Sequence, residues 1–171
     1  GILTSHLGVV KKIHQQKKGF PKQGVLIIED DAQVNFKRLK SALKSVNKYK
    51  DSIIYFGGTL HPPDTFKNKT WSHEETIKSF KRGINHIDTK KFRILGGHGY
   101  YFPKWEIAKD LLDKVDSKKK MRALDSEMVK LQRSGDIKYF YYPALSYLHM
   151  DDAVKGVHGA GYIKRNMKHY L

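Results

Sequence analysis

The sequence contains no cysteine, and this absence excludes several kinds of chemistry at once. A chain without thiols has no disulfide framework, no thiolate metal ligand and no cysteine nucleophile. It also lacks any apolar run near the ~20 residues that cross a bilayer, and its first residues lack the basic and apolar segments of a secretory signal. These absences predict a soluble, cytoplasmic protein.

Several common functional motifs are missing as well. There is no Walker-type phosphate loop, no GxGxxG after an apolar strand and no GxSxG. Nucleotide hydrolysis, dinucleotide redox chemistry and serine hydrolysis therefore lack their usual sequence signals. Arginine is scarce, with 6 residues against 27 lysines. Because base-edge recognition favours the planar guanidinium group, sequence-specific nucleic-acid binding is not the first expectation.

What the chain has in excess is positive charge. Its 33 Lys and Arg residues against 17 Asp and Glu residues give a formal net charge of +16. A field of this sign attracts phosphates, acidic lipids and nucleic acids without distinguishing among them. One hypothesis is therefore a non-catalytic, Lys-rich module that binds nucleic acid or anionic surfaces, with peripheral contact with an anionic membrane among its options.

Length and hydrophobicity predict a single folded domain over residues 1–171. A chain of this length suits one domain, and 39% hydrophobic with 12% aromatic residues argues against intrinsic disorder. Apolar periodicity and turn residues predict alternating helices and strands, and thus an α/β layered fold. The expected elements are a helix at 3–18, a strand at 24–28, a helix at 36–46, a strand at 52–56, a loop at 59–72, a short helix ending near 83, strands at 92–95 and 100–102, helices at 103–112 and 124–135, and a strand at 137–142.

The sharpest candidate site is the acidic run Glu29-Asp30-Asp31, directly after the first apolar strand. Burying carboxylates is costly unless they are paired or bound to a cation, so these residues belong at the open edge of a sheet. Carboxylate oxygens there suit Mn²⁺ or Mg²⁺, which in turn could hold a diphosphate. The alternative is a solvated turn in which Asp31 caps the next helix.

A second candidate is the glycine-rich stretch Gly96-Gly97-His98-Gly99. Glycines let backbone amides approach a ligand closely, or they simply form a tight hairpin. The hairpin is the commoner outcome. His98 is then either a polar pocket residue or a surface turn residue.

Asp125 and Glu127 open a predicted helix. Asp125 is a plausible N-cap, and Glu127 lies in the first turn, where the helix dipole favours negative charge. The spacing alone favours these structural roles over a catalytic role. The functional alternative makes one of these carboxylates a general base that deprotonates a hydroxyl.

Histidines and aspartates also gather in the last part of the chain, at His149, Asp151, Asp152 and His158. They lack the compact spacing of a closed zinc site. A single ligand that completes the site at Glu29–Asp31 is the more credible function, and ordinary surface residues are the alternative.

Taken in order, these motifs resemble those of glycosyltransferase family 25, which includes lipooligosaccharide and collagen galactosyltransferases. The segments that carry the resemblance run nearly the length of the chain: 1–6 (GILTSH), 25–31 (VLIIEDD), 53–58 (IIYFGG), 97–102 (GHGYYF) before an amphipathic helix, and 124–125 (LD). No single segment is specific to the family, but the ordered set of segments is more specific than any one of them.

The resemblance implies a GT-A-like fold: three αβα layers around a mixed, mainly parallel sheet. It also implies divalent-metal-assisted transfer of a sugar, with inversion, from a nucleotide-diphosphate donor such as a UDP-sugar to a hydroxyl of a glycan or glycoprotein, as in lipopolysaccharide biosynthesis. The donor-binding residues that it implies are Ser5, His6, Glu29, Asp30, Gly97 and His98. The implied metal ligands are Asp31, Glu29 and, by wider analogy, His158, and either Asp125 or Glu127 is the implied base.

Members of that family usually carry a strand and a helix before the Ser-His segment. This strand and helix surround the base of the nucleotide. This chain begins at that segment. The resemblance therefore predicts either an N-terminally truncated piece or a shortened protein whose donor site is incomplete or is completed by another chain. A degenerate transferase that keeps only the fold is a further alternative.

Overall fold

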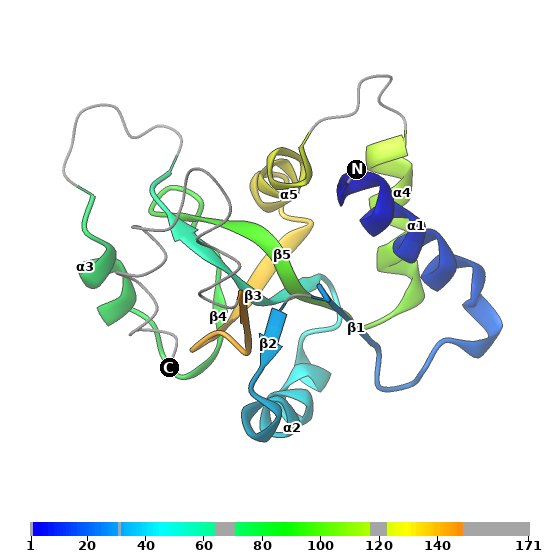
Figure 1. The fold of residues 1–171 in the computed structure, drawn as a ribbon, viewed down its shortest axis with the longest axis horizontal. Helices are drawn as coiled ribbons and strands as arrows, with labels where there is room; N and C mark the ends of the chain where they lie inside the picture. Colours follow the sequence, from blue (N-terminus) through cyan, green and yellow to red (C-terminus); the bar gives the residue numbers. More distant parts are fainter. Residues whose placement is uncertain (1, 31, 64–70, 117–122, 149–171) are drawn as a thin grey trace.

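A computed structural model describes residues 2–30, 32–63, 71–116 and 123–148 (Figure 1). Its helices are α1 (Ile2–Gln15), α2 (Phe36–Ser45), α3 (His73–Lys78), α4 (Trp105–Asp116) and α5 (Leu124–Arg133), with short 3-10 turns η1 (Lys17–Gly19) and η2 (Val46–Lys48). Its strands are β1 (Val25–Ile28), β2 (Ala32–Val34), β3 (Ile53–His61), β4 (Gly83–His86), β5 (Arg93–Phe102), β6 (Ile137–Tyr142) and β7 (Ser146–Leu148).

Five strands form the central sheet, in the order β1-β5-β3-β6-β4. Only β3 and β6 run parallel; the other three neighbouring pairs are antiparallel. The α/β class is confirmed, whereas the expected mainly parallel sheet is wrong. A continuous apolar strand indicates that both faces of the sheet are covered, but it does not fix the direction of the neighbouring strand.

Both faces of the sheet carry a hydrophobic core, which gives three layers. Along β3, Ile53 and Tyr55 pack into the first core, on one face of the sheet. Ile54 and Phe56 pack into the second core, on the other face. This alternation follows from the two-residue period of a strand. Helices α1, α4 and α5 contribute to the first core, and α2 lies on the opposite side of the sheet (Figure 1).

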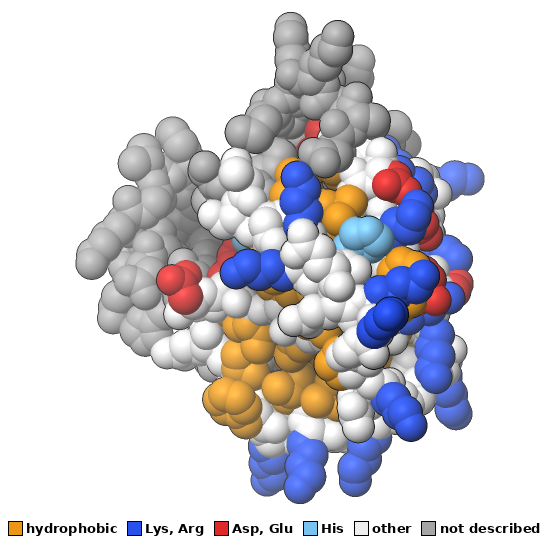
Figure 2. All heavy atoms as spheres, turned by 90° about the vertical axis from the view of Figure 1, so that its right-hand side faces the viewer, with side chains coloured by type: hydrophobic (Ala, Val, Ile, Leu, Met, Phe, Trp, Pro, Cys, Tyr) orange, Lys and Arg blue, Asp and Glu red, His pale blue; other side chains and the backbone are white. Residues whose placement is uncertain are grey.

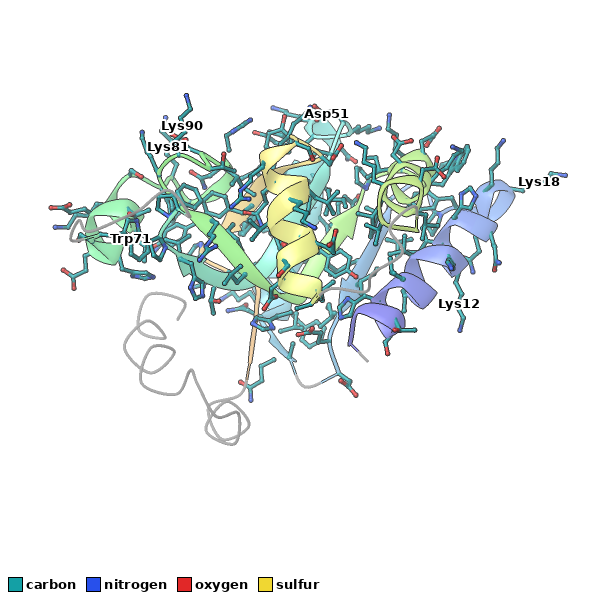
Figure 3. The ribbon with its side chains drawn as sticks, turned by 90° about the horizontal axis from the view of Figure 1, so that it is seen from above. Lys12, Lys18, Asp51, Trp71, Lys81 and Lys90 are labelled. Carbon is teal, nitrogen blue, oxygen red and sulfur yellow. The ribbon has the colours of Figure 1, made fainter. Side chains whose placement is uncertain are left out.

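Two long helices are tied to the first face by specific contacts. Val10 and Ile13 of α1 are buried in the core beside α4. On α5, the buried Gln132 side chain donates to the carbonyl of Ile94 at 2.7 Å and accepts from its amide at 3.0 Å, as a neighbouring strand would. Seen from above, α5 lies across the sheet, with α1 and α4 to one side and α3 at the opposite end (Figure 3).

Several local expectations differ from the structure. Residues 93–102 form one continuous strand rather than a hairpin, and β3 extends to His61, into the expected loop. The helix expected to end near 83 is α3, which ends at Lys78, while Gly83 begins β4. The cap of α2 is Asn35, whose side chain accepts from the Arg38 amide, so the proposed capping role of Asp31 is wrong. The short strand β2 separates Asp31 from that helix.

The described helices include none that is long and apolar enough to cross a bilayer.

Candidate functional site

Side chains from three separate elements meet at Glu29, the residue after β1. β1 lies at the edge of the sheet and pairs with β5, with Ile28 opposite Gly99. This pairing brings Glu29 next to His98, whose carbonyl accepts from the Glu29 amide at 3.4 Å. Helix α1 covers the same region and contributes His6.

The Glu29 carboxylate is held between two histidines. Its Oε1 lies 3.2 Å from Nε2 of His6, and its Oε2 lies 2.8 Å from Nδ1 of His98. The hydrogen bonds from His6 and His98 outweigh the effect of burial and lower the pKa of Glu29 to about 2, against an ordinary value of 4.5. Because an ionised carboxylate only accepts hydrogen bonds, both ring nitrogens that face it carry protons.

The hydrogen-bonded cluster continues through His6 to Tyr100. The Tyr100 hydroxyl lies 2.6 Å from Nδ1 of His6, and the two rings stack with centroids 5.6 Å apart. Burial raises the pKa of Tyr100, so its hydroxyl stays protonated and can donate. The His6 ring thus links the Tyr100 hydroxyl, at Nδ1, to the Glu29 carboxylate, at Nε2.

The glycines of β5 let the helices approach this cluster. A Cβ on Gly97 would lie 3.0 Å from Cδ2 of Leu124, 3.1 Å from Cε1 of His6 and 3.2 Å from Oε1 of Glu29. Gly96 has a positive φ of 87°, and a Cβ there would lie 2.8 Å from Nε2 of His98. The glycine-rich stretch therefore serves close approach within a strand, and the hairpin interpretation is wrong.

Asp125 joins the site from the first turn of α5. Its Oδ1 accepts a hydrogen bond from the Gly96 amide at 2.8 Å, and its side chain is exposed. The N-cap of α5 is Ala123, so the expectation that Asp125 caps this helix is wrong. Its acceptor role instead fastens α5 to the glycine-rich part of β5.

Glu127 occupies a different environment from Asp125. Its side chain is buried, and Oε1 accepts from Nζ of Lys130 at 2.7 Å. A carboxylate held in this way is poorly placed to reach a substrate. Of the two acids on α5, Asp125 is the one open to solvent beside the cluster.

The remaining predicted site residues are not part of this cluster as described. Ser5 and Asp30 have exposed side chains. Asp31, His149, Asp151, Asp152 and His158 lie outside the described residues.

Sequence reasoning missed Tyr100 as a site residue. The signal was present, because Tyr100 follows His98 by two positions and residues two apart on a strand share a face. The expected turn at 96–99 interrupted that strand and hid the relationship.

Within the described ranges, no group of three His, Asp or Glu side chains is arranged to hold a metal. Both carboxylate oxygens of Glu29 accept hydrogen bonds from histidine N–H groups, so they are not positioned to coordinate a cation. The described residues do not fit a metal centre, and the metal roles of Asp31 and His158 stay predictions from the sequence.

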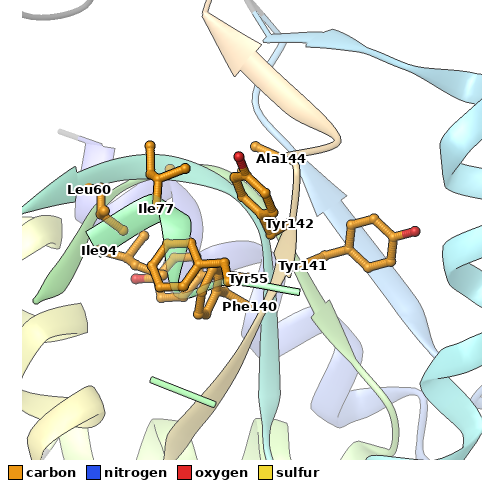
Figure 4. A pocket seen from close by; sticks show the side chains of 11 residues that line it. Tyr55, Leu60, Ile77, Ile94, Phe140, Tyr141, Tyr142 and Ala144 are labelled. Carbon is orange, nitrogen blue, oxygen red and sulfur yellow. The ribbon is translucent and has the colours of Figure 1, made fainter. Parts of the chain in front are cut away.

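A small apolar hollow lies elsewhere, between α3 and strands β3, β5 and β6 (Figure 4). Its walls include Tyr55, Ile77, Phe140 and Tyr142, and its volume is about 30 Å³. That volume admits one or two water molecules, which is far less than a nucleotide sugar needs. None of the residues around Glu29 lines it, so the hollow is not part of the candidate site.

Comparison of the chain with models of protein families, with curated proteins and with solved structures found no match in any of the three.

Proposed function

We propose that this chain is a glycosyltransferase of the GT-A type that moves a sugar from a nucleotide-diphosphate donor, such as a UDP-sugar, to a hydroxyl of a glycan or protein. One observation carries the proposal. Segments far apart in the sequence, which resemble the ordered motifs of family 25, meet at one cluster: His6, Glu29, Gly97 and His98 are in contact, and Asp125 is bonded to the neighbouring Gly96.

Glu29 is a positioning residue in this proposal. Held by two histidines and ionised, it fixes the end of β1, from which the exposed Asp30 and the adjacent Asp31 follow. Rigid support of this kind matters because small displacements of catalytic groups reduce rates strongly. Donor contact is assigned to the exposed Asp30, with the buried Gly97 and His98 behind it as part of the supporting cluster, and the sequence-based metal ligand is Asp31.

Asp125 is the proposed base. The Gly96 amide holds its Oδ1, so Oδ2 is the oxygen that we assign to the acceptor proton. As the acceptor oxygen bonds to the anomeric carbon, its proton passes to Asp125 and the bond to the diphosphate breaks with its electron pair on the leaving oxygen. Displacement in one step inverts the anomeric centre.

The net charge of +16 supports an anionic donor. A positive field raises the local concentration of diphosphates near the surface. It equally supports the alternative of a Lys-rich binding module, so charge alone does not favour the transferase.

Release of nucleoside diphosphate tests the proposal. Wild type and Asp125→Asn are incubated with a panel of nucleotide sugars, a hydroxyl acceptor mixture and Mn²⁺, and the diphosphate is quantified. Loss of a general base is expected to lower the turnover rate by about 100-fold or more. Asp110→Asn is the matched control, because Asp110 is an exposed carboxylate on α4.

Equal turnover by wild type and Asp125→Asn would reject Asp125 as the base. No diphosphate release from any donor, together with salt-sensitive binding to unrelated DNA, would favour the binding module. A separate comparison of Asp31→Ala with wild type, with and without Mn²⁺, tests the metal role.

A further inference from the structure

Helix α2 carries two large apolar side chains that are exposed in the described part of the chain. Phe36 is 75% exposed and Leu43 is 37% exposed. Leu39, partly buried against the second core, lies between them in the sequence. Because residues three and four apart are neighbours on a helix, these side chains form one continuous surface, the α2 strip (Phe36, Leu39 and Leu43).

Packing against the second core does not bury Phe36 and Leu43, the exposed residues of the α2 strip. Ala42 and Val46 are the fully buried residues of α2 and η2, and they face the second core. On a helical projection, Phe36 and Leu43 lie within about 20° of each other and about a quarter-turn from that core direction. Single exposed apolar side chains are common, but contiguous ones rimmed by polar residues are typical of interaction surfaces.

The residues around the α2 strip are basic. Residues 36–48 contain Lys37, Arg38, Lys40, Lys44 and Lys48, and they contain no Asp or Glu. Lys40 is spaced four residues after Phe36 and three before Leu43, and it is exposed, as are Lys37 and Lys44. Figure 2 shows hydrophobic side chains gathered above a row of Lys and Arg at the bottom of the molecule, the level of α2 in Figure 1.

We propose that the α2 strip and its lysines dock the protein on an anionic lipid surface. Phe36 and Leu43 would enter the boundary between headgroups and acyl chains, while Lys37, Lys40 and Lys44 meet acidic headgroups. Helices that lie in a membrane surface combine these two features: an apolar side that is buried and flanking lysines. The partner is an anionic surface because every charged residue of the segment 36–48 is basic.

The residue types favour lipid over nucleic acid. Four of the five basic residues in this segment are lysines, which act as point charges, whereas base-edge recognition favours the arginine fork. Leu43 adds apolar area that a bilayer buries and a phosphate backbone does not. Nucleic acid is therefore an outcome of the test rather than the proposed partner.

Flotation with vesicles tests the proposal. The full chain is mixed with vesicles of phosphatidylcholine alone, or of phosphatidylcholine with phosphatidylserine, at low and physiological salt. We expect partitioning only onto the vesicles that contain phosphatidylserine, and weaker partitioning as salt rises. Phe36→Ser and Lys40→Glu are each expected to lower the partition coefficient by roughly tenfold.

Matched controls place equivalent changes elsewhere. Val9→Ser alters another exposed apolar residue, 40% exposed on α1. Lys90→Glu reverses an exposed lysine at the end of the molecule that carries α3 (Figure 3). Both controls are expected to leave partitioning within about twofold of wild type. All four positions are on the surface, so the variants should fold, which circular dichroism checks.

Three results would overturn the proposal. The first is that the wild-type chain does not partition onto phosphatidylserine vesicles at low salt. The second is that the control variants lose as much vesicle partitioning as the α2 variants. The third is that the α2 variants lose DNA binding but keep vesicle binding. The proposal is independent of the transferase proposal. Vesicle binding needs no sugar donor, and Phe36→Ser is expected to release diphosphate from a soluble donor at the wild-type rate.

Discussion

Replacement of Glu29 by glutamine removes the charge at the centre of the candidate site while keeping its shape. Glu29 accepts from Nε2 of His6 at 3.2 Å and from Nδ1 of His98 at 2.8 Å. A glutamine amide offers one oxygen acceptor and one NH₂ donor, so only one histidine N–H keeps an acceptor. The other ring must change tautomer or lose its hydrogen bond.

The size of the effect follows from the pKa of Glu29, which falls from 4.5 to about 2. At about 1.4 kcal/mol per pKa unit, this corresponds to roughly 3 kcal/mol of stabilisation. The Glu29 side chain is 20% exposed, and solvent screening reduces such interactions. We therefore expect Glu29→Gln to lower the free energy of unfolding by about 1–2 kcal/mol at neutral pH.

The dependence on pH has a defined sign. The pKa of Glu29 is lower in the folded state than its ordinary value of 4.5, so the stabilisation is complete above that pH. It is lost as the pH falls from about 4.5 toward 2, because Glu29 then becomes protonated in the folded state as well. The stability difference between wild type and Glu29→Gln should therefore narrow in acid.

Urea unfolding followed by circular dichroism measures this difference, at about pH 7 and about pH 3. Glu74→Gln is the matched control, because Glu74 is an exposed carboxylate on α3. It is expected to change the free energy of unfolding by no more than about 0.5 kcal/mol. The reasoning is refuted if Glu29→Gln is as stable as wild type at neutral pH, or if its deficit is the same at both pH values.

Three further substitutions test the packing of α1 and of the contact between α5 and β5. Gly97→Ala puts a Cβ 3.0 Å from Cδ2 of Leu124 and should lower the free energy of unfolding by about 1–2 kcal/mol. In Gly8→Ala no atom lies within 4 Å of the new Cβ, so the better helix propensity of alanine should raise the free energy of unfolding by about 0.5–1 kcal/mol. Thermal unfolding measures both, and a stabilising Gly97→Ala would contradict the close approach. Gln132→Met removes both hydrogen bonds to the Ile94 backbone, so the Ile94 amide should exchange its hydrogen faster and the domain should lose about 1–3 kcal/mol. An unchanged exchange rate would show that Gln132 does not protect that amide.

Much of the element order could be predicted from the sequence, because it depends on local pattern. The apolar run 25–28 is a strand, and the amphipathic segments that begin at 36, 105 and 124 are helices. Strand direction could not be predicted, because burial on both faces is compatible with parallel and antiparallel neighbours. The sequence does not indicate the continuous strand at 93–102, because glycine is usual in turns, whereas here it lets the α1 and α5 side chains approach the strand.

Most residues of the candidate site could be predicted, Tyr100 excepted, but their arrangement could not. His6, Glu29 and His98 each stood out, yet the contact between Glu29 and His98 spans 69 residues, and the contact between His6 and Tyr100 spans 94. Such pairings depend on tertiary packing, which local spacing does not encode. The role of Asp125 was misjudged for the same reason, since its partner, Gly96, belongs to a distant strand.

The most direct test of the transferase proposal is calorimetric titration of the intact chain with a panel of nucleotide sugars, with and without Mn²⁺. The account predicts saturable binding of at least one nucleotide sugar, strengthened by Mn²⁺. It also predicts unchanged donor binding in Asp125→Asn, because that residue acts on the acceptor. Absence of binding for every nucleotide sugar, with the chain folded by circular dichroism, would contradict it.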